Sequence, residues 1–347
     1  MSSSLFPEIQ RLTEKLHTTQ LPAPLLQKTE EEIRQIASLL ERGGSSTRLD
    51  LIAQYIDWIV HLPWNTTSED ILDISHAKEI MDSHHHGLHA IKQRILEYLS
   101  VLILAQKNQT THTYTPILLF VGLAGTGKTS FTSSIAEALG KKFARIPFGG
   151  LSLASDLRGG RKTIPEAAPG LIMRALYETG SRNPVILLDE IDRIAPEGKA
   201  GIMGVLIELL DPAQNNHFVD HYIDYPFDLS SVLFVATANT THHIGAAVMD
   251  RLEVIEMPSY SDEEKIVIAR DYILPRLMKE SGLPKNCLAI DETVWKKIAR
   301  MSGYDPGMRS VTRYVEEMVR KAAYKYVKKE GEQFTITEAT MKDYVEE

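Results

Sequence analysis

Hydrophobic residues in the N-terminal part of the chain recur every three or four positions. This spacing predicts amphipathic helices, because it places apolar side chains on one face of a helix with 3.6 residues per turn. Helix-breaking residues separate the runs, at Pro22, Gly43 and Pro63. We therefore expect a bundle of three helices here, with Trp58 and Trp64 as anchors in its core or at an interface.

The pattern changes between residues 114 and 257, where short, mostly apolar segments alternate with helical stretches. Apolar runs of four to six residues are typical of buried strands, and their alternation with helices predicts βαβ units around a parallel sheet. The predicted strands are residues 117–121, 143–148, 185–188, 232–236 and 254–257. A long helical stretch before them, Ile74 to Lys107, is interrupted by His84, His85 and His86. We expect a solvated turn at these histidines rather than a metal site, because consecutive helical positions point in different directions.

Helical periodicity returns beyond Pro258. It predicts helices over residues 266–277, 293–301 and 309–326, a short extended segment at 334–337 and a final amphipathic helix that ends at Val345. These elements are enough for a second, smaller domain.

The first apolar run of the central region ends in a segment with the spacing G-x-x-x-x-G-K-[ST], which we call the phosphate loop. Its members are Gly122, Leu123, Ala124, Gly125, Thr126, Gly127, Lys128 and Thr129, and Ser130 follows them. Glycines let backbone N–H groups turn toward phosphate oxygens, and the helix that follows directs the positive end of its dipole at them. Lys128 adds a charge at the outer phosphates, and the Thr129 hydroxyl can bind Mg²⁺. A chance glycine-rich turn is the alternative, and the strand before and helix after this segment disfavour it.

Polar side chains follow two of the other predicted strands. Asp189 and Glu190 close the run 185–188, and Asn239 follows the run 232–236. Ligands of open α/β sheets bind at the carboxyl ends of the strands, so these side chains are candidates for the same site. Asp189 suits the Mg²⁺ shell, Glu190 suits the polarisation of an attacking water, and the amide of Asn239 suits that water or the terminal phosphate. As an alternative, Asp189 and Glu190 form an acidic pair at a helix N-terminus.

Composition narrows the classes of partner. The 347 residues carry a formal net charge of −8, which argues against a protein that binds nucleic acid through its overall field. The chain has one cysteine, Cys287, and therefore no intramolecular disulfide, which suits a reducing compartment. No apolar run approaches the roughly 18 residues of a membrane span. We expect a cytoplasmic protein that does not enter membranes.

Several longer stretches resemble the Lon family of ATP-dependent proteases, within the AAA+ ATPases. They are LPWN (62–65), ILEYL (95–99), LLDEID (187–192), ELLDPAQN (208–215), FVDHYIDYPFDLS (218–230), ATANT (236–240) and DRLEVIE (250–256). The resemblance implies an α/β P-loop NTPase fold with a parallel five-stranded sheet. It also implies three domains: a helical N-terminal subdomain (1–64), a large nucleotide-binding domain (65–258) and a small, mostly helical lid (259–347).

The same resemblance assigns roles to individual residues. Lys128, Thr129, Asp189 and Glu190 take the phosphate, Mg²⁺ and water-activating roles of an ATPase. Asn239 matches the first sensor, Arg251 the arginine finger that reaches a neighbouring subunit, and Arg309 the second sensor. For both arginines the alternative is a surface salt bridge. A finger supplied by a neighbour implies a hexameric ring of identical chains, with ATP hydrolysis coupled to the unfolding and translocation of damaged or unfolded proteins.

Two features depart from the family pattern. Nothing in these residues resembles the Ser–Lys proteolytic domain, so we expect an ATPase without a peptidase site of its own, working with a proteolytic subunit or domain elsewhere. The segment 158–170 aligns with the loop that lines the pore, where relatives carry an aromatic and then an aliphatic residue. Ile164 and Pro165 occupy these positions, and we expect a weakened grip on substrate. The resemblance therefore leaves open a stand-alone chaperone, scaffold or regulatory AAA+ protein, whereas the Lon-specific stretches exclude a DNA-associated clamp loader or initiator.

Overall fold

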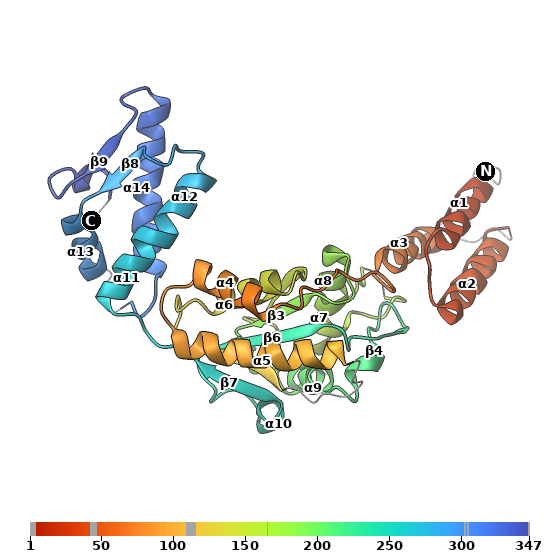
Figure 1. Cartoon of the computed structure of the whole chain (residues 1–347). Helices are drawn as coiled ribbons and strands as arrows, with labels where there is room; N and C mark the ends of the chain where they lie inside the picture. The colour runs from red at the N-terminus through yellow and green to blue at the C-terminus, as the bar shows by residue number, and fades with distance from the viewer. Residues whose placement is uncertain are drawn as a thin grey trace. The chain divides into compact units, whose positions relative to one another are not determined.

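The computed structural model describes residues 5–41, 47–108, 116–164, 166–301, 303 and 305–345. Figure 1 shows the helices and strands of the chain with their labels. They belong to two compact units, neither of them continuous in sequence. Unit 1 comprises Met1–Ile71, Thr110–Leu119 and Leu139–Glu253, and unit 2 comprises Leu72–Gln109, Phe120–Ala138 and Val254–Glu347. The domain boundaries expected near residues 64 and 258 stay predictions.

The central sheet has five strands in the order β2-β3-β6-β1-β7. Both β2 and β6 pair in parallel with β3, so that Leu188 lies between Ile146 and Ala236. This register brings the carboxyl ends of β3 and β6 side by side. The strand bounds are β1 Ile117–Val121, β2 Phe143–Pro147, β3 Val185–Asp189, β6 Leu233–Ala238 and β7 Leu252–Glu256. The predicted α/β fold with a five-stranded parallel sheet is confirmed, and each strand overlaps the segment that was predicted as a strand.

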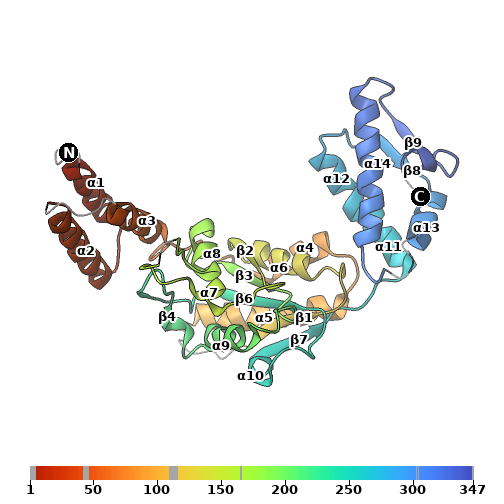
Figure 2. The same ribbon diagram turned by 180° about the vertical axis from the view of Figure 1, so that it is seen from behind.

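The N-terminal residues of unit 1 form the three expected helices, which Figure 2 shows gathered into a bundle. Their bounds are α1 Leu5–His17, α2 Ala23–Glu41 and α3 Thr47–His61. Leu16, Leu25, Ile56 and Ile59 are fully buried, as the helical spacing predicted. Trp64 is also buried and packs its ring against Phe227 of the α/β part of the same unit, which confirms its role as an anchor.

Unit 1 contains further elements besides the bundle and the sheet strands β2, β3 and β6. They are helices α7 Ala154–Arg158, α8 Leu171–Thr179, α9 Lys199–Leu209 and α10 Ala246–Met249, the 3₁₀ turn η1 Asn215–His217, and the two short strands β4 Phe218–Val219 and β5 Pro226–Phe227. Helix α8 packs against β2 and ends at Gly180, which takes the left-handed conformation that favours glycine. The antiparallel strands β4 and β5 are joined by a loop, residues 220–225.

Unit 2 contains the helices on either side of the phosphate loop and the C-terminal lid. Its helical elements are α4 Ile74–His84, α5 His89–Lys107, α6 Lys128–Ala138, α11 Asp262–Ile268, η2 Ala269–Ile273, α12 Leu274–Glu280, α13 Glu292–Met301, α14 Arg309–Val327 and η3 Met341–Asp343. Ser261 and Glu264 form a capping box that begins α11. The helix predicted over 266–277 is present as three consecutive helical segments, α11, η2 and α12. The middle one, η2, is a π-helical turn that precedes Pro275, a residue without an N–H to donate. No helix in the described ranges is long and apolar enough to cross a membrane.

The lid core forms around Trp295, which is buried among apolar residues of α12, α13 and α14. Strand β8 Leu288–Ile290 pairs in parallel with β9 Phe334–Ile336, and only the second of these was predicted. The predicted C-terminal helix is wrong. Thr337 N–H donates to the Thr340 hydroxyl, a local side-chain bond that competes with helix formation, and only the short turn η3 follows.

The expectation of a solvated turn at the three histidines is also wrong for His85. Its ring is buried and stacks on Phe131 of α6 at 3.7 Å between centroids, with Nε2 2.9 Å from the Ser134 hydroxyl. Burial lowers the pKa of His85 to about 3, with a smaller contribution from the neighbouring His84 and Lys92. No cluster of metal-ligating side chains occurs among the residues that the structure describes.

Because His85 is neutral in the folded state and charges more readily when unfolded, stability should fall as the pH drops below 6.5. Linkage predicts a loss of about 2 kcal/mol in unfolding free energy between pH 7 and pH 5. Urea unfolding of wild type and His85→Phe, which keeps the stacked ring, measures the difference in slope. The exposed His89 supplies the control: His89→Asn should keep the wild-type slope, and an equal slope in His85→Phe would contradict the assignment.

Candidate functional site

The phosphate loop of unit 2 connects β1 to α6, as its spacing predicted. Lys128 is the first residue of α6, and its ammonium donates to the carbonyl oxygens of Gly122 (2.6 Å) and Leu123 (3.0 Å). The lysine side chain therefore folds back onto the first residues of its own loop. The hydroxyl-bearing residues Thr129 and Ser130 are exposed in the first turn of the helix, where they can reach a ligand.

The loop's glycines are required by its geometry. Gly125 and Gly127 have φ of 83° and 95°, which side chains other than glycine rarely adopt. A Cβ on Gly122 would lie 2.6 Å from the carbonyl oxygen of Met257. A glycine-rich loop with positive φ values at the start of a helix is the kind of backbone that binds phosphate through its N–H groups.

The lid supplies two further groups to this loop within unit 2. Met308 N–H donates to the Gly125 carbonyl at 3.0 Å, and Arg309, the predicted second sensor, begins α14 beside Gly125. The Tyr260 hydroxyl donates to the Thr126 carbonyl at 3.1 Å, and burial raises the pKa of that tyrosine to about 12. The structure thus brings Arg309 to the phosphate loop, with its guanidinium on an exposed side chain.

Asp189 lies at the carboxyl end of β3 in unit 1 and is 5% exposed. One of its oxygens accepts from Arg145 of β2, through Nε at 2.7 Å and Nη2 at 2.6 Å. The other accepts a very short bond from the Thr237 hydroxyl of β6. The sequence indicated neither Arg145 nor Thr237, because their relation to Asp189 depends on strand pairing across the sheet.

Glu190 follows directly and has a φ of 58°, in the left-handed region that is strained for a residue with a side chain. Its N–H donates to the Thr237 hydroxyl at 2.9 Å, and the next N–H, of Ile191, donates to the Thr237 carbonyl at 3.0 Å. The carboxylate is partly exposed and lies 3.5 Å from the Arg193 guanidinium. The two adjacent carboxylates therefore differ in environment. Asp189 is buried and bonded to Arg145 and Thr237, whereas Glu190 is partly exposed and lies near Arg193.

Asn239 lies one residue beyond β6, next to the end of β3. Its N–H and that of Thr240 both donate to one carboxylate oxygen of Asp192, at 3.1 and 3.2 Å. Asp192 therefore fixes the backbone from which the Asn239 amide projects. The pairing of β3 with β6 places the Asp189, Glu190 and Asn239 positions at the same edge of the sheet, whereas the functional roles assigned to them stay predictions.

Arg251 precedes β7 and is paired within its own unit. Its guanidinium donates to Asp211 at 2.9 Å and to the Ala247 carbonyl at 2.7 Å. The bond from Arg251, together with the N–H of Ala213, holds the pKa of Asp211 below its usual value. In the single chain the predicted finger thus makes the salt bridge that the sequence left as its alternative role.

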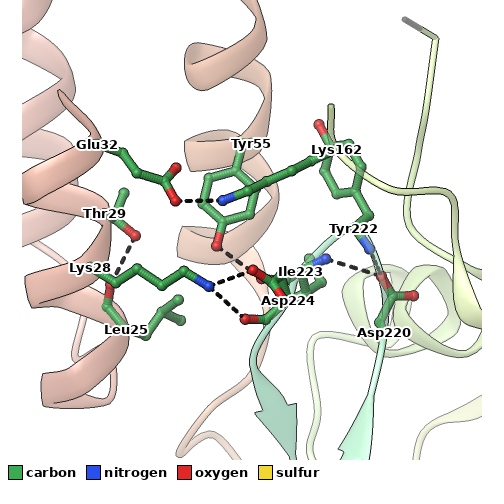
Figure 3. Close-up of polar contacts among 10 residues, drawn as sticks. All are labelled: Leu25, Lys28, Thr29, Glu32, Tyr55, Lys162, Asp220, Tyr222, Ile223 and Asp224. Carbon is green, nitrogen blue, oxygen red and sulfur yellow. Dashed lines mark hydrogen bonds and ion pairs between the residues drawn. The ribbon is translucent and has the colours of Figure 1, made fainter. Parts of the chain in front are cut away.

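The loop between α7 and α8 carries Ile164, whose side chain is 55% exposed, whereas Pro165 lies outside the described residues. The base of this loop is held by the buried carboxylate of Asp220. Its oxygens accept from the N–H group of Gly170 and from those of Tyr222 and Ile223. Figure 3 shows the bonds from Tyr222 and Ile223. Burial raises the pKa of Asp220 to about 6 in spite of these bonds.

The same loop contacts the N-terminal bundle (Figure 3). The Lys162 ammonium lies 2.6 Å from a Glu32 oxygen of α2 and 4.4 Å from the centroid of the Tyr55 ring on α3. The Tyr55 hydroxyl donates to the Ile223 carbonyl at 2.9 Å, and Lys28 pairs with Asp224. The bundle, to which the sequence assigned no chemistry, therefore contacts both the exposed loop and the β4–β5 loop.

Each unit offers groups of the kind that bind a nucleotide or its cation. In unit 2, the phosphate loop offers backbone N–H groups and the Lys128 ammonium for phosphate oxygens, and the Thr129 hydroxyl is an oxygen ligand of the kind that Mg²⁺ prefers. In unit 1, the Asp189 carboxylate is an oxygen ligand of the same kind, and the Glu190 carboxylate is partly exposed.

Comparison with known proteins gives a consistent result. Residues 118–260 match the model of the ATPase family associated with various cellular activities (AAA). This range includes the phosphate loop, the ends of β3 and β6, and Arg251, and it stops before Arg309.

Among curated proteins, the Lon protease of Lawsonia intracellularis is 43% identical over 330 residues, which cover 95% of this chain and 39% of that protein. Lon protease 2 of Thermus thermophilus is 40% identical, with 97% of this chain and 42% of that protein covered. Lon protease 1 of Bacillus subtilis is 39% identical, with 97% and 43% covered. The chain thus spans about two fifths of the length of the curated relatives that it matches.

Proposed function

Because this chain belongs to the Lon protease family, we propose that it binds and hydrolyses Mg-ATP as the motor module of an ATP-dependent system for protein degradation. The observation that supports this most directly is the pairing of a complete phosphate loop with an acidic strand end in one AAA domain. Similarity to Lon proteases over nearly all of the chain supports a role in protein degradation.

The residues divide the work as follows. The phosphate loop and Lys128 bind the β- and γ-phosphates, and Thr129 and Asp189 hold Mg²⁺, which neutralises charge on the phosphates. Glu190 polarises the attacking water, and Asn239 orients it. Arg309 contacts the phosphates from the lid, and Arg251 leaves Asp211 to serve the nucleotide of the next subunit. Each role places a donor or base where charge develops in the transition state.

A finger that acts between subunits requires a closed ring, and we propose a homohexamer in the cytoplasm. Its substrates are unfolded or damaged proteins, and a proteolytic domain or subunit degrades what the ring delivers. The exposed loop that carries Ile164 is the candidate for gripping the substrate. An aliphatic side chain offers less contact area than an aromatic one, which favours a weaker grip and leaves an ATP-dependent chaperone or scaffold as the second candidate function.

The test is ATP turnover per chain as a function of protein concentration, with ring size followed by sedimentation. We expect turnover to rise cooperatively as rings form, and we expect Lys128→Ala to abolish ATP binding. Tight binding by wild type with no turnover at any concentration would favour the scaffold. Failure of wild type to bind ATP, or turnover that Lys128→Ala does not change, would overturn the proposal.

A further inference from the structure

Thr237 is the one side chain of β6 that hydrogen-bonds to both acidic residues at the end of β3 in the described structure. It is fully buried in the middle of the sheet. Its hydroxyl accepts the Glu190 N–H at 2.9 Å and donates its own hydrogen to Asp189. A hydroxyl has one hydrogen and two lone pairs, so both bonds form at once.

This arrangement links two features that have no local cause in the sequence. Glu190 takes a φ of 58°, which costs free energy in a residue with a Cβ and persists only where the surroundings hold it. The Asp189 carboxylate has a fixed orientation, with Thr237 on one oxygen and Arg145 on the other. In both cases Thr237 supplies a contact from the neighbouring strand.

We propose that Thr237 is a positioning residue for hydrolysis, which holds Glu190 in its strained turn and couples the direction of that side chain to the orientation of Asp189. The proposal rests on the proposed ATPase function for its kinetic consequence, but not for its structural one. Thr237 is fully buried, and it acts through its hydrogen bonds to the two carboxylate-bearing residues.

The chemistry of the bonds explains why a hydroxyl is required at this position. Valine has the same shape but leaves the Glu190 N–H buried without its acceptor, and Asp189 without one donor. Serine keeps both bonds. Two hydrogen bonds that share one hydroxyl also polarise each other. The bond from the Glu190 N–H and the bond to the Asp189 carboxylate are therefore each stronger than they would be without the other. The pair Thr237→Val and Thr237→Ser therefore separates the hydroxyl from the side-chain volume.

The first measurement needs no turnover. Amide hydrogen exchange resolved to single residues reports on the Glu190 N–H, and the adjacent Ile191 N–H serves as an internal control because its acceptor is the Thr237 backbone carbonyl. In Thr237→Val we expect exchange at Glu190 to quicken by about tenfold or more, with Ile191 nearly unchanged. Equal protection of Glu190 in wild type and Thr237→Val would overturn the proposal, whether or not the chain hydrolyses ATP.

The second measurement is steady-state ATP hydrolysis. We expect Thr237→Val to lower kcat by about 10- to 100-fold with little change in KM, and Thr237→Ser to restore most of the rate, because the base is misdirected while the phosphate loop is intact. Thr29→Val removes another fully buried threonine hydroxyl from unit 1, one that donates to the Leu25 carbonyl of α2 and also hydrogen-bonds to Tyr55 of α3, and it should keep wild-type kcat. A kcat loss in Thr29→Val equal to that in Thr237→Val would reduce Thr237 to a general structural role. If wild type itself shows no turnover, the proposed function fails, and the exchange measurement still decides this one.

Discussion

Glu190→Gln is expected to lower ATP turnover by about 10²- to 10⁴-fold, the range for loss of a positioned general base. Glutamine has the shape of glutamate and keeps the backbone N–H that donates to Thr237, so the strained turn at φ 58° is retained. The substitution therefore removes basicity while leaving the geometry in place. Nucleotide affinity should change little, because the phosphate loop in unit 2 is untouched.

Single-turnover hydrolysis measures the chemical step, and fluorescence titration with an ATP analogue measures binding. Glu178→Gln is the matched control, because Glu178 is an exposed glutamate on α8 of the same unit. Turnover by Glu190→Gln within about threefold of both wild type and the control would show that Glu190 is not the base. Loss of binding together with turnover would place it in nucleotide recognition instead.

The parts of the fold that could be predicted are those set by short stretches of sequence. Uninterrupted apolar runs predicted β1, β3 and β6, because a strand buried on both faces needs such a segment. The predicted strands at β2 and β7 also exist, although they include charged residues and are only partly buried. The phosphate loop was recognisable for a similar reason. Gly125 and Gly127 take positive φ, and Lys128 begins the helix, so the geometry depends on residues that are adjacent in the chain.

Contacts between distant segments could not be predicted in this way. Arg145 reaches Asp189 from β2, and Asp220 holds the base of a loop that begins some 60 residues earlier in the chain. The burial of His85 was not predicted for the same reason. Its neighbours in sequence are polar, and its burial depends on Phe131 of a helix that follows the phosphate loop.

The lid shows where local and tertiary preferences compete. Amphipathic spacing at the C-terminus predicted a helix. Instead, the chain turns directly beyond β9, where Thr337 N–H donates to the Thr340 hydroxyl, and β9 itself pairs with β8. Strand β8 itself is three residues long, too short for a period to be read from sequence. Its existence depends on the partner strand.

Arg251→Ala is expected to lower turnover in assembled rings by about 10³- to 10⁵-fold, the effect of an arginine finger on phosphoryl transfer. In the single chain Arg251 is bonded to Asp211, so the measurement must separate a finger from a salt bridge. Asp211→Asn makes that separation, because it weakens the same ion pair and leaves the guanidinium in place. A finger predicts near-normal turnover in Asp211→Asn, whereas equal losses in the two variants would indicate a structural ion pair.

Mixing experiments then show whether the arginine acts between subunits. Arg251→Ala chains keep their own Glu190, and Glu190→Gln chains keep their own arginine, so each variant is inactive alone. In a mixed ring, a site is complete wherever an Arg251→Ala chain receives the arginine of a Glu190→Gln neighbour, about a quarter of all sites at equal amounts in a head-to-tail ring. We expect turnover to recover to about that fraction of wild type, since every repaired site takes its arginine across an interface. An arginine that served its own chain's nucleotide would give no recovery at any ratio.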